Sequence, residues 1–209
     1  QGKRKESFTG SVVGPGKMLE VHIIYTQHCL LVLYYSTRII RETIDFIIHH
    51  PELVDKLVLV YAQAYIDGAA MTGQPRFLQS LGVSVLKSKP LRMFANKIAY
   101  ADPEKFGTED AMRIGRLHCL TPGWEDAMIG FMDSGGYKLS AKVKEMMPKP
   151  TLVLWGRQDK ILPPEQYVDK FVSDIEEARL EWVNDCGHVP HLEQPQRIAD
   201  LIADFLGLS

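Results

Sequence analysis

Cysteine is scarce in this chain, and no apolar run is long. The three cysteines, Cys29, Cys119 and Cys186, are odd in number and far apart, so the sequence predicts neither a disulfide framework nor a CxxC metal or redox site. We therefore expect a reducing intracellular compartment, either cytoplasm or plastid. The longest apolar stretch, 23–35, contains polar residues and is too short to cross a bilayer, so we expect no membrane span.

The chain also lacks an excess of either charge. Its 24 Lys and Arg residues nearly balance 26 Asp and Glu residues, so electrostatics favours neither a nucleic acid nor an anionic membrane as partner. A length of 209 residues, 45% of them hydrophobic, suffices for one domain with a sizeable core. No secretory signal is visible. Because the chain begins with Gln1 rather than Met, we expect its N-terminal part, with any targeting segment, to be missing.

Strand and helix signals alternate over much of the sequence. Runs of β-branched, aromatic and other apolar residues predict strands, several of them of the type buried on both faces of a parallel sheet. Apolar residues at helical spacing predict helices between them. This alternation implies a parallel α/β sheet with right-handed crossovers. The expected strands are 21–35, 57–60, 151–155 and 179–183, and the expected helices are 36–50, 164–172 and 195–206.

Residues 68–148 differ from the rest of the chain in composition. Their pattern is helical, rich in Met and Lys, interrupted by prolines and glycines, and without a strong strand signal. We therefore expect three parts. These are an atypical segment over 1–43, a core made of 44–67 and 149–209, and a helical insertion, or lid, over 68–148.

Asp159 and His188 are the candidate catalytic residues. Each lies a few residues beyond the apolar end of a predicted strand, where functional groups gather in open parallel sheets. There an imidazole can take a proton from a nucleophile if a buried carboxylate fixes its tautomer. Gly187 would let the backbone turn sharply just before the base. The plainer alternatives are an Asp159 that only caps the next helix and a His188 that is simply solvated.

Two neighbouring side chains are rivals for these roles. Asp185 is a rival acid, although its closeness to His188 in the sequence makes Asp159 the preferred partner. His191 is a rival base, but its neighbours suit the start of the last helix, so we expect it behind His188 rather than in its place.

Three segments around these residues resemble the α/β-hydrolase fold family, in its esterase, epoxide hydrolase and C–C hydrolase branch. They are H-P-E-L-V-D-K-L-V-L-V at 50–60, L-V-L-W-G-R-Q-D-K-I-L-P at 152–163 and G-H-V-P-H-L-E-Q-P at 187–195. Residues 115–128 are in addition similar to lids of plant members. The resemblance runs from about residue 44 to the end. It implies a parallel sheet with a helical lid, Asp159 as the triad acid and His188 as the triad base.

The nucleophile motif of that family, Gly-x-Ser-x-Gly, is not found. The resemblance places it about four helical turns before Pro51, where Ser36 and Thr37 supply hydroxyls that no glycine flanks. Ser36 is the candidate nucleophile, and a helix N-cap is the interpretation that we favour for it. A second elbow-like stretch, 11–16, has Gly16 at the nucleophile position. We therefore expect early strands, elbow and oxyanion-hole loop to be missing or altered, as in a truncated or splice-variant form.

The sequence supports two main functional hypotheses. The first is a hydrolase that cleaves an ester or similar small apolar substrate by a nucleophile–His–Asp mechanism, with turnover impaired in this chain. The second is a catalytically inactive, hydrolase-like protein that binds a ligand or a partner. We expect no cofactor and no metal, and the oligomeric state stays open. The histidines and cysteine that might suggest a metal lack acidic ligands and tight spacing; they are His22, His28, Cys29, His49 and His50.

Overall fold

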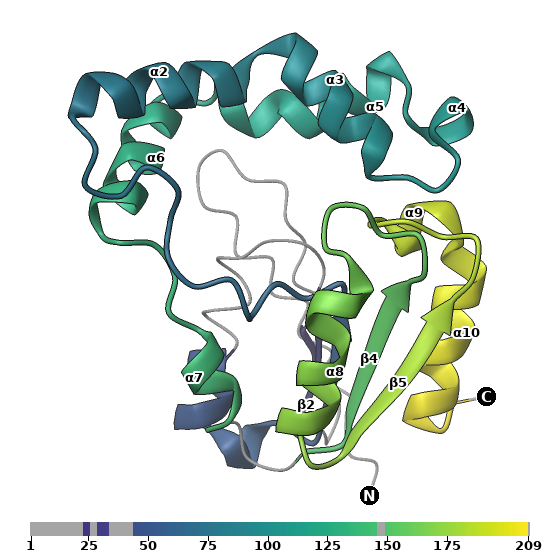
Figure 1. The fold of residues 1–209 in the computed structure, drawn as a ribbon. Helices are drawn as coiled ribbons and strands as arrows, with labels where there is room; N and C mark the ends of the chain where they lie inside the picture. Colours follow the sequence, from purple (N-terminus) through teal and green to yellow (C-terminus); the bar gives the residue numbers. More distant parts are fainter. Residues whose placement is uncertain (1–22, 26–28, 34–43, 146–148, 209) are drawn as a thin grey trace, which may run out of the picture.

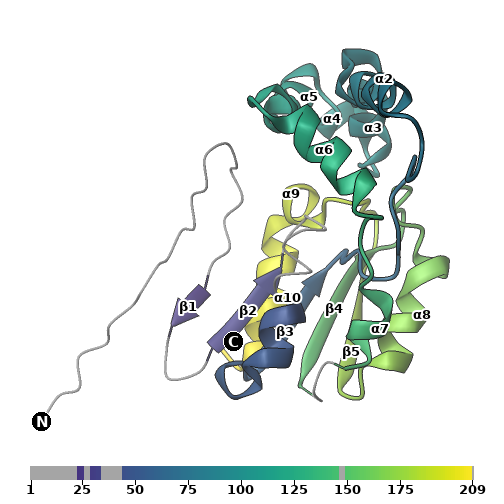
Figure 2. The same ribbon diagram turned by 90° about the vertical axis from the view of Figure 1, so that its left-hand side faces the viewer.

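The computed structural model describes residues 23–25, 29–33, 44–145 and 149–208. At its centre is a five-stranded sheet in which strand order follows chain order (Figures 1 and 2). The first strand is antiparallel to the second, and the other neighbours pair in parallel. The strands are β1 Ile23–Tyr25, β2 Cys29–Leu33, β3 Lys56–Val60, β4 Thr151–Gly156 and β5 Ala178–Val183.

The middle of the sheet is buried on both faces. Side chains of β3 and β4 alternate between an apolar layer under α8 (Pro164–Asp174) and one under α10 (Pro195–Leu206). Figure 2 shows these two helices on opposite sides of the sheet. Unbroken apolar runs in the sequence are the mark of such two-sided burial. The first layer includes Ile44, Ile47, Leu57, Leu59, Val153, Trp155, Val168 and Phe171, and the second Val58, Val60, Leu152, Leu154, Ile198 and Leu201.

Most predicted core elements are confirmed. The strands predicted at 57–60, 151–155 and 179–183 are β3, β4 and β5, and the last helix has its predicted bounds as α10. The single strand predicted over 21–35 is wrong. Strands β1 and β2 instead pair antiparallel, with Ile23 opposite Leu31. Fifteen residues exceed the usual length of one strand, and the polar Thr-Gln-His at 26–28 interrupts the apolar run.

Between β3 and β4 the chain forms a helical segment, residues 69–136, which we call the insert. Its helices lie beyond the carboxyl ends of the strands (Figure 1), and no strand occurs among its residues. A small apolar cluster of Val83, Ile129 and Met132 joins α2 to α6. In the part of the chain that the structure describes, no helix is both long and apolar enough to cross a membrane. The helices are α2 Arg76–Lys87, α3 Lys89–Ile98, α4 Pro103–Phe106, α5 Glu109–Arg116 and α6 Trp124–Asp133.

The two ends of the insert are fastened together at a neck. The Gly68 N–H donates to the Tyr137 carbonyl at 2.6 Å, and the two residues form an isolated β-bridge. The carboxylate of Asp67 accepts from the Leu139 N–H at 2.8 Å and from the backbone and hydroxyl of Ser140. These bonds, led by that of the Ser140 hydroxyl, hold the pKa of Asp67 below its usual value. After the neck, α7 (Ser140–Val143) packs on the sheet, with Val143 in its core.

Candidate active site

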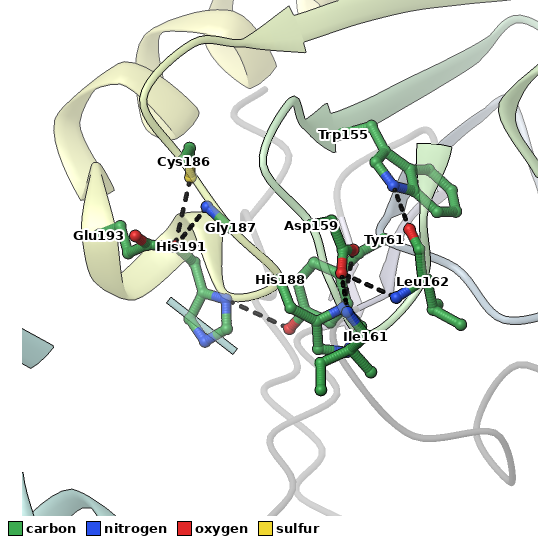
Figure 3. Close-up of polar contacts among 10 residues, drawn as sticks. All are labelled: Tyr61, Trp155, Asp159, Ile161, Leu162, Cys186, Gly187, His188, His191 and Glu193. Atoms are coloured by element: carbon green, nitrogen blue, oxygen red, sulfur yellow. Dashed lines mark hydrogen bonds and ion pairs between the residues drawn. The ribbon is translucent and has the colours of Figure 1, made fainter. Parts of the chain in front are cut away.

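Residues from three strand ends meet at the carboxyl edge of the sheet (Figure 3). Tyr61 directly follows β3, Asp159 follows the end of β4, and His188 follows the end of β5. The three strands are parallel, so their carboxyl ends share one edge, and loops leaving that edge can bring distant residues into contact.

Asp159 and His188 form a buried hydrogen-bonded pair. One carboxylate oxygen of Asp159, Oδ2, lies 2.8 Å from Nδ1 of His188, and each residue is only 4% exposed. A carboxylate acceptor requires that Nδ1 carry the proton, which leaves Nε2 as the basic nitrogen of a neutral ring. The other carboxylate oxygen accepts from the backbone N–H groups of Ile161 and Leu162, both at 2.8 Å. Asp159 therefore fixes its own loop and the imidazole together.

The structure also bears on the plainer alternative roles of Asp159 and His188. Asp159 does cap backbone N–H groups, but in the turn before α8, whose own N-cap is Pro163 without a side-chain cap bond. His188 is buried rather than solvated. The rival acid Asp185 is exposed and lies 3.4 Å from the side-chain nitrogen of Gln158.

The turn before His188 is made differently from the sequence prediction. The left-handed backbone conformation falls on Asp185, with φ 51°, and not on Gly187; aspartate tolerates this region better than most residues. Gly187 is needed for space. A Cβ there would lie 2.6 Å from the Ala99 carbonyl oxygen and 2.8 Å from the Ala101 nitrogen. The prediction of a sharp glycine turn is therefore wrong, and close packing is the reason for this glycine.

His191 sits behind the pair in a short helix of its own, α9 (Pro190–Glu193), rather than at the start of the last helix. Its Nδ1 lies 3.2 Å from the Tyr61 hydroxyl, and the two rings stack with centroids 5.9 Å apart. Burial, and to a smaller degree His188, lowers the pKa of His191 to about 4. A ring with this pKa is neutral at physiological pH and adds no positive charge beside His188.

Tyr61 is a site residue that the sequence analysis missed. Its ring centroid lies 4.8 Å from that of His188, and the residue is 2% exposed. It also has a positive φ of 42°, which is rare and costly for a bulky side chain. Its position immediately after the apolar run 57–60 is the signal that could have found it.

Cys119 and Cys186 are poorly suited to act as nucleophiles. Cys186 and Cys119 are both buried, and burial raises the pKa of each thiol. Around Cys186, the carboxylates of Glu193 and Asp159 raise the pKa further. Neither thiol is therefore stabilised as the reactive thiolate.

Several predicted features lie outside the described residues. These include the candidate nucleophile Ser36 with its neighbour Thr37, the elbow-like stretch 11–16, and His22 and His28 of the metal hypothesis. His49 and His50 are exposed. Among the described residues, no three His, Cys, Asp or Glu side chains are grouped closely enough to hold a metal ion.

Comparison with known sequences finds a matching family model and several relatives. A family model described as alpha/beta hydrolase fold matches residues 92–195, a range that contains Asp159 and His188. The Arabidopsis thaliana alpha/beta hydrolase domain-containing protein VTE7 is 42% identical over 163 residues, which are 78% of this chain and 49% of that protein. The Mus musculus monoacylglycerol lipase ABHD6 is 33% identical over 79 residues, 36% of this chain and 23% of the lipase. The chain thus spans about half the length of the plant relative.

Solved structures show the same fold. The serine hydrolase CCSP0084 from the polyaromatic hydrocarbon-degrading bacterium Cycloclasticus zankles superimposes with a TM-score of 0.62, over 86% of this chain and 64% of that one. The two sequences are 18% identical. At that identity the likeness concerns the arrangement of strands and helices alone.

Proposed function

Because this chain is an α/β-hydrolase-fold protein related to hydrolases and lipases, we propose that it hydrolyses an ester or similar acyl bond of a small apolar substrate. His188 is the general base and Asp159 is its orienting acid. The observation that carries the proposal is the buried Nδ1–carboxylate contact of 2.8 Å at the carboxyl edge of the sheet. With Nδ1 bonded to the carboxylate, Nε2 of His188 is the ring nitrogen that can accept a proton.

The proposed reaction has two halves. A hydroxyl nucleophile attacks the acyl carbonyl and gives its proton to Nε2 of His188, which passes it to the leaving alcohol as the acyl-enzyme forms. Water then attacks the acyl-enzyme and gives a proton to the same nitrogen. The acid product leaves as the nucleophile recovers its proton. Asp159 orients the ring and stabilises the imidazolium that forms.

Ser36 is the first hydroxyl to test as the nucleophile. It follows the last residue of β2 by three positions, and β2 is parallel to β3. The carboxyl end of β2 therefore lies on the edge that carries Asp159 and His188. The residues flanking Ser36 at two positions on each side are Tyr34 and Arg38 instead of glycines, so we expect slow turnover.

The insert is proposed to act as the lid of this site. It lies beyond the carboxyl ends of the strands (Figure 1), and its α3–α4 turn contacts the loop that carries His188. An apolar lid would exclude water from the acyl intermediate and select apolar substrates.

A fluorophosphonate probe tests the proposal directly, because it labels a serine that a neighbouring base activates. We expect slow labelling of the wild-type chain, none of Ser36→Ala, and a rate about a thousandfold lower for His188→Gln. Ser84→Ala, at an exposed position of α2, is the matched control and should label as the wild type does.

Two outcomes would contradict the proposal. One is a folded wild-type chain that the probe leaves unlabelled. The other is labelling that proceeds equally fast in His188→Gln. Either result would favour the second hypothesis, an inactive hydrolase-like protein that binds a ligand or partner.

A further inference from the structure

Glu193 joins two segments that lie far apart in the sequence. Its Oε1 accepts from the Gly187 N–H at 2.7 Å, and its Oε2 accepts from the Ala101 N–H at 2.8 Å. Gly187 immediately precedes His188, whereas Ala101 lies in the α3–α4 turn of the insert. One carboxylate in α9 thus holds both backbones, and each bond is of the stronger, charge-assisted kind.

The insert also forms a hydrogen bond with the backbone of His188. The His188 N–H donates to the Ala99 carbonyl at 2.6 Å. Gly187 is confined from two sides, since a Cβ would approach Ala99 and Ala101, and a Cβ on Gly156 at the end of β4 would overlap the Gly187 carbonyl. The backbone of Gly187 and His188 is therefore held between β4 and the insert.

The carboxylate of Glu193 affects its surroundings in ways that fit this position. Tyr100 lies between Ala99 and Ala101 in the sequence. Burial raises its pKa, and the charge of Glu193 raises it further. Glu193 also accepts a weak hydrogen bond from the Cys186 thiol at 3.7 Å. Figure 3 shows Glu193 beside Cys186 and Gly187, on the far side of the loop from Asp159.

We propose that Glu193 is a positioning residue that seats the main chain of His188 against the insert. Asp159 fixes the imidazole through its side chain, and Glu193 fixes the backbone from the opposite side. The lid and the catalytic base then form one unit at this point, so the lid cannot lift at its α3–α4 turn without displacing His188. The inference rests on the proposed function for the role of His188 as base, but the contacts can be tested without any activity.

Residue-resolved amide exchange of the whole chain by NMR provides the first test. In Glu193→Ala we expect the amides of Ala101 and Gly187 to exchange roughly 10- to 100-fold faster, as for the loss of a hydrogen bond to a charged acceptor. Amides of β3 and β4 should keep their wild-type rates. In Glu193→Gln one side-chain oxygen remains, so the change should be smaller. Glu176→Ala removes an exposed carboxylate elsewhere and is the control.

A spectroscopic signature of His188 provides the second test. The Nδ1 proton shared with Asp159 should give a low-field resonance in the wild type and in the Glu176→Ala control. We expect this resonance to broaden or disappear in Glu193→Ala, because the backbone that positions the ring is no longer held. In the conservative Glu193→Gln we expect the resonance to be present, as in the wild type. A residue that served stability alone would not move this resonance while the chain stays folded.

The proposal is overturned if exchange at Ala101 and Gly187 is unchanged, or if it rises equally throughout the chain. It is also overturned if the His188 resonance is the same in all folded variants. Should Glu193→Ala fail to fold, Glu193→Gln is judged by amide exchange alone: faster exchange confined to Ala101 and Gly187 supports the proposal, and unchanged exchange at both overturns it. These outcomes are independent of fluorophosphonate labelling, so a chain that labels nothing can still confirm or refute the role of Glu193.

Discussion

The sheet and the insert are stabilised in different ways. The sheet has two apolar layers whose members, such as Trp155 and Leu154, are fully buried. The insert has a small apolar cluster of Val83, Ile129 and Met132, and it leaves large apolar side chains such as Phe77, at 71% exposure, in solvent. Since buried apolar area is the main source of stability, we expect the sheet to be more stable than the insert, which relies more on its attachments.

Those attachments include polar contacts at two places and an aromatic contact between Phe131 and Tyr137, whose ring centroids are 4.6 Å apart. The neck at Asp67, Gly68 and Tyr137 fastens both ends of the insert, and the contacts of Ala99 and Ala101 fasten its α3–α4 turn. The comparison teaches that apolar layers stabilise the sheet, whereas the insert is held in place by contacts at its two ends and at its α3–α4 turn. Segments with little core and many exposed backbone bonds open at lower free energy than the rest of a protein.

The largest effect should follow from damage to the sheet. Trp155→Ala removes a fully buried side chain whose Nε1 donates to the Leu162 carbonyl at 3.2 Å. We expect the free energy of unfolding to fall by about 3–5 kcal/mol, measured by chemical denaturation. Phe77→Ala, in the insert, is the matched aromatic control and should change it by less than about 0.5 kcal/mol. Equal losses in the two variants would remove the contrast between the regions.

A smaller and local effect should follow from damage to the neck. Asp67→Ala leaves the N–H groups of Leu139 and Ser140 without this acceptor. We expect local opening at the neck to become easier by about 2 kcal/mol, seen as faster amide exchange at Gly68 and Leu139, with unchanged exchange in β4. Asp102→Ala removes a carboxylate that accepts from Lys105 at the start of α4 and should leave the neck unaffected. Faster exchange throughout β4 would show that the neck belongs to the sheet's own cooperative unit.

The smallest effect concerns pH and His191. Burial lowers its pKa from 6.5 to about 4, so folding favours the neutral ring. The contribution of this pKa difference to the free energy of unfolding is complete above pH 6.5 and is lost as the pH falls toward 4. His191→Gln removes this term, so we expect its stability to fall less than that of the wild type over this window, by about 1 kcal/mol after allowance for partial exposure.

Parallel unfolding curves at pH 7 and pH 4.5 measure that difference. His50→Gln replaces an exposed histidine and should behave as the wild type at both pH values. The assignment to His191 fails if its variant and the wild type lose the same stability on acidification.

Much of the core could be predicted from the sequence because local patterns determine it. The apolar runs at 57–60 and 151–155 are long enough to identify strands buried on both faces, and Asp159 and His188 lie just beyond strand ends. These signals need no knowledge of distant contacts. The polar interruption at 26–28 was present too, but its consequence, a hairpin of β1 and β2, depends on pairing between segments.

The rest could not be predicted because contacts between distant residues decide it. Glu193 and Ala101 are 92 residues apart in the sequence, and neither residue type nor spacing indicates their bond. The sequence analysis assigned Gly187 to a sharp turn. The structure instead requires a glycine there because the backbone of the insert lies too close to leave room for a Cβ. The position of Tyr61 after the apolar run 57–60 marks a strand end, but its positive φ and its contact with His188 become visible only in the fold.

The neck has a consequence for the engineering of this molecule. Because Gly68 and Tyr137 are bridge partners, the residues that flank the insert on its two sides are about one strand spacing apart, roughly 5 Å. A two-residue hairpin turn can close that distance, so residues 69–136 could be exchanged for a short turn, or for the corresponding segment of a relative, with the strand register kept. Such a graft would also replace Ala99 and Ala101, the seat of His188. A transplanted segment would therefore need a matching turn for Glu193 before it could transfer a substrate preference.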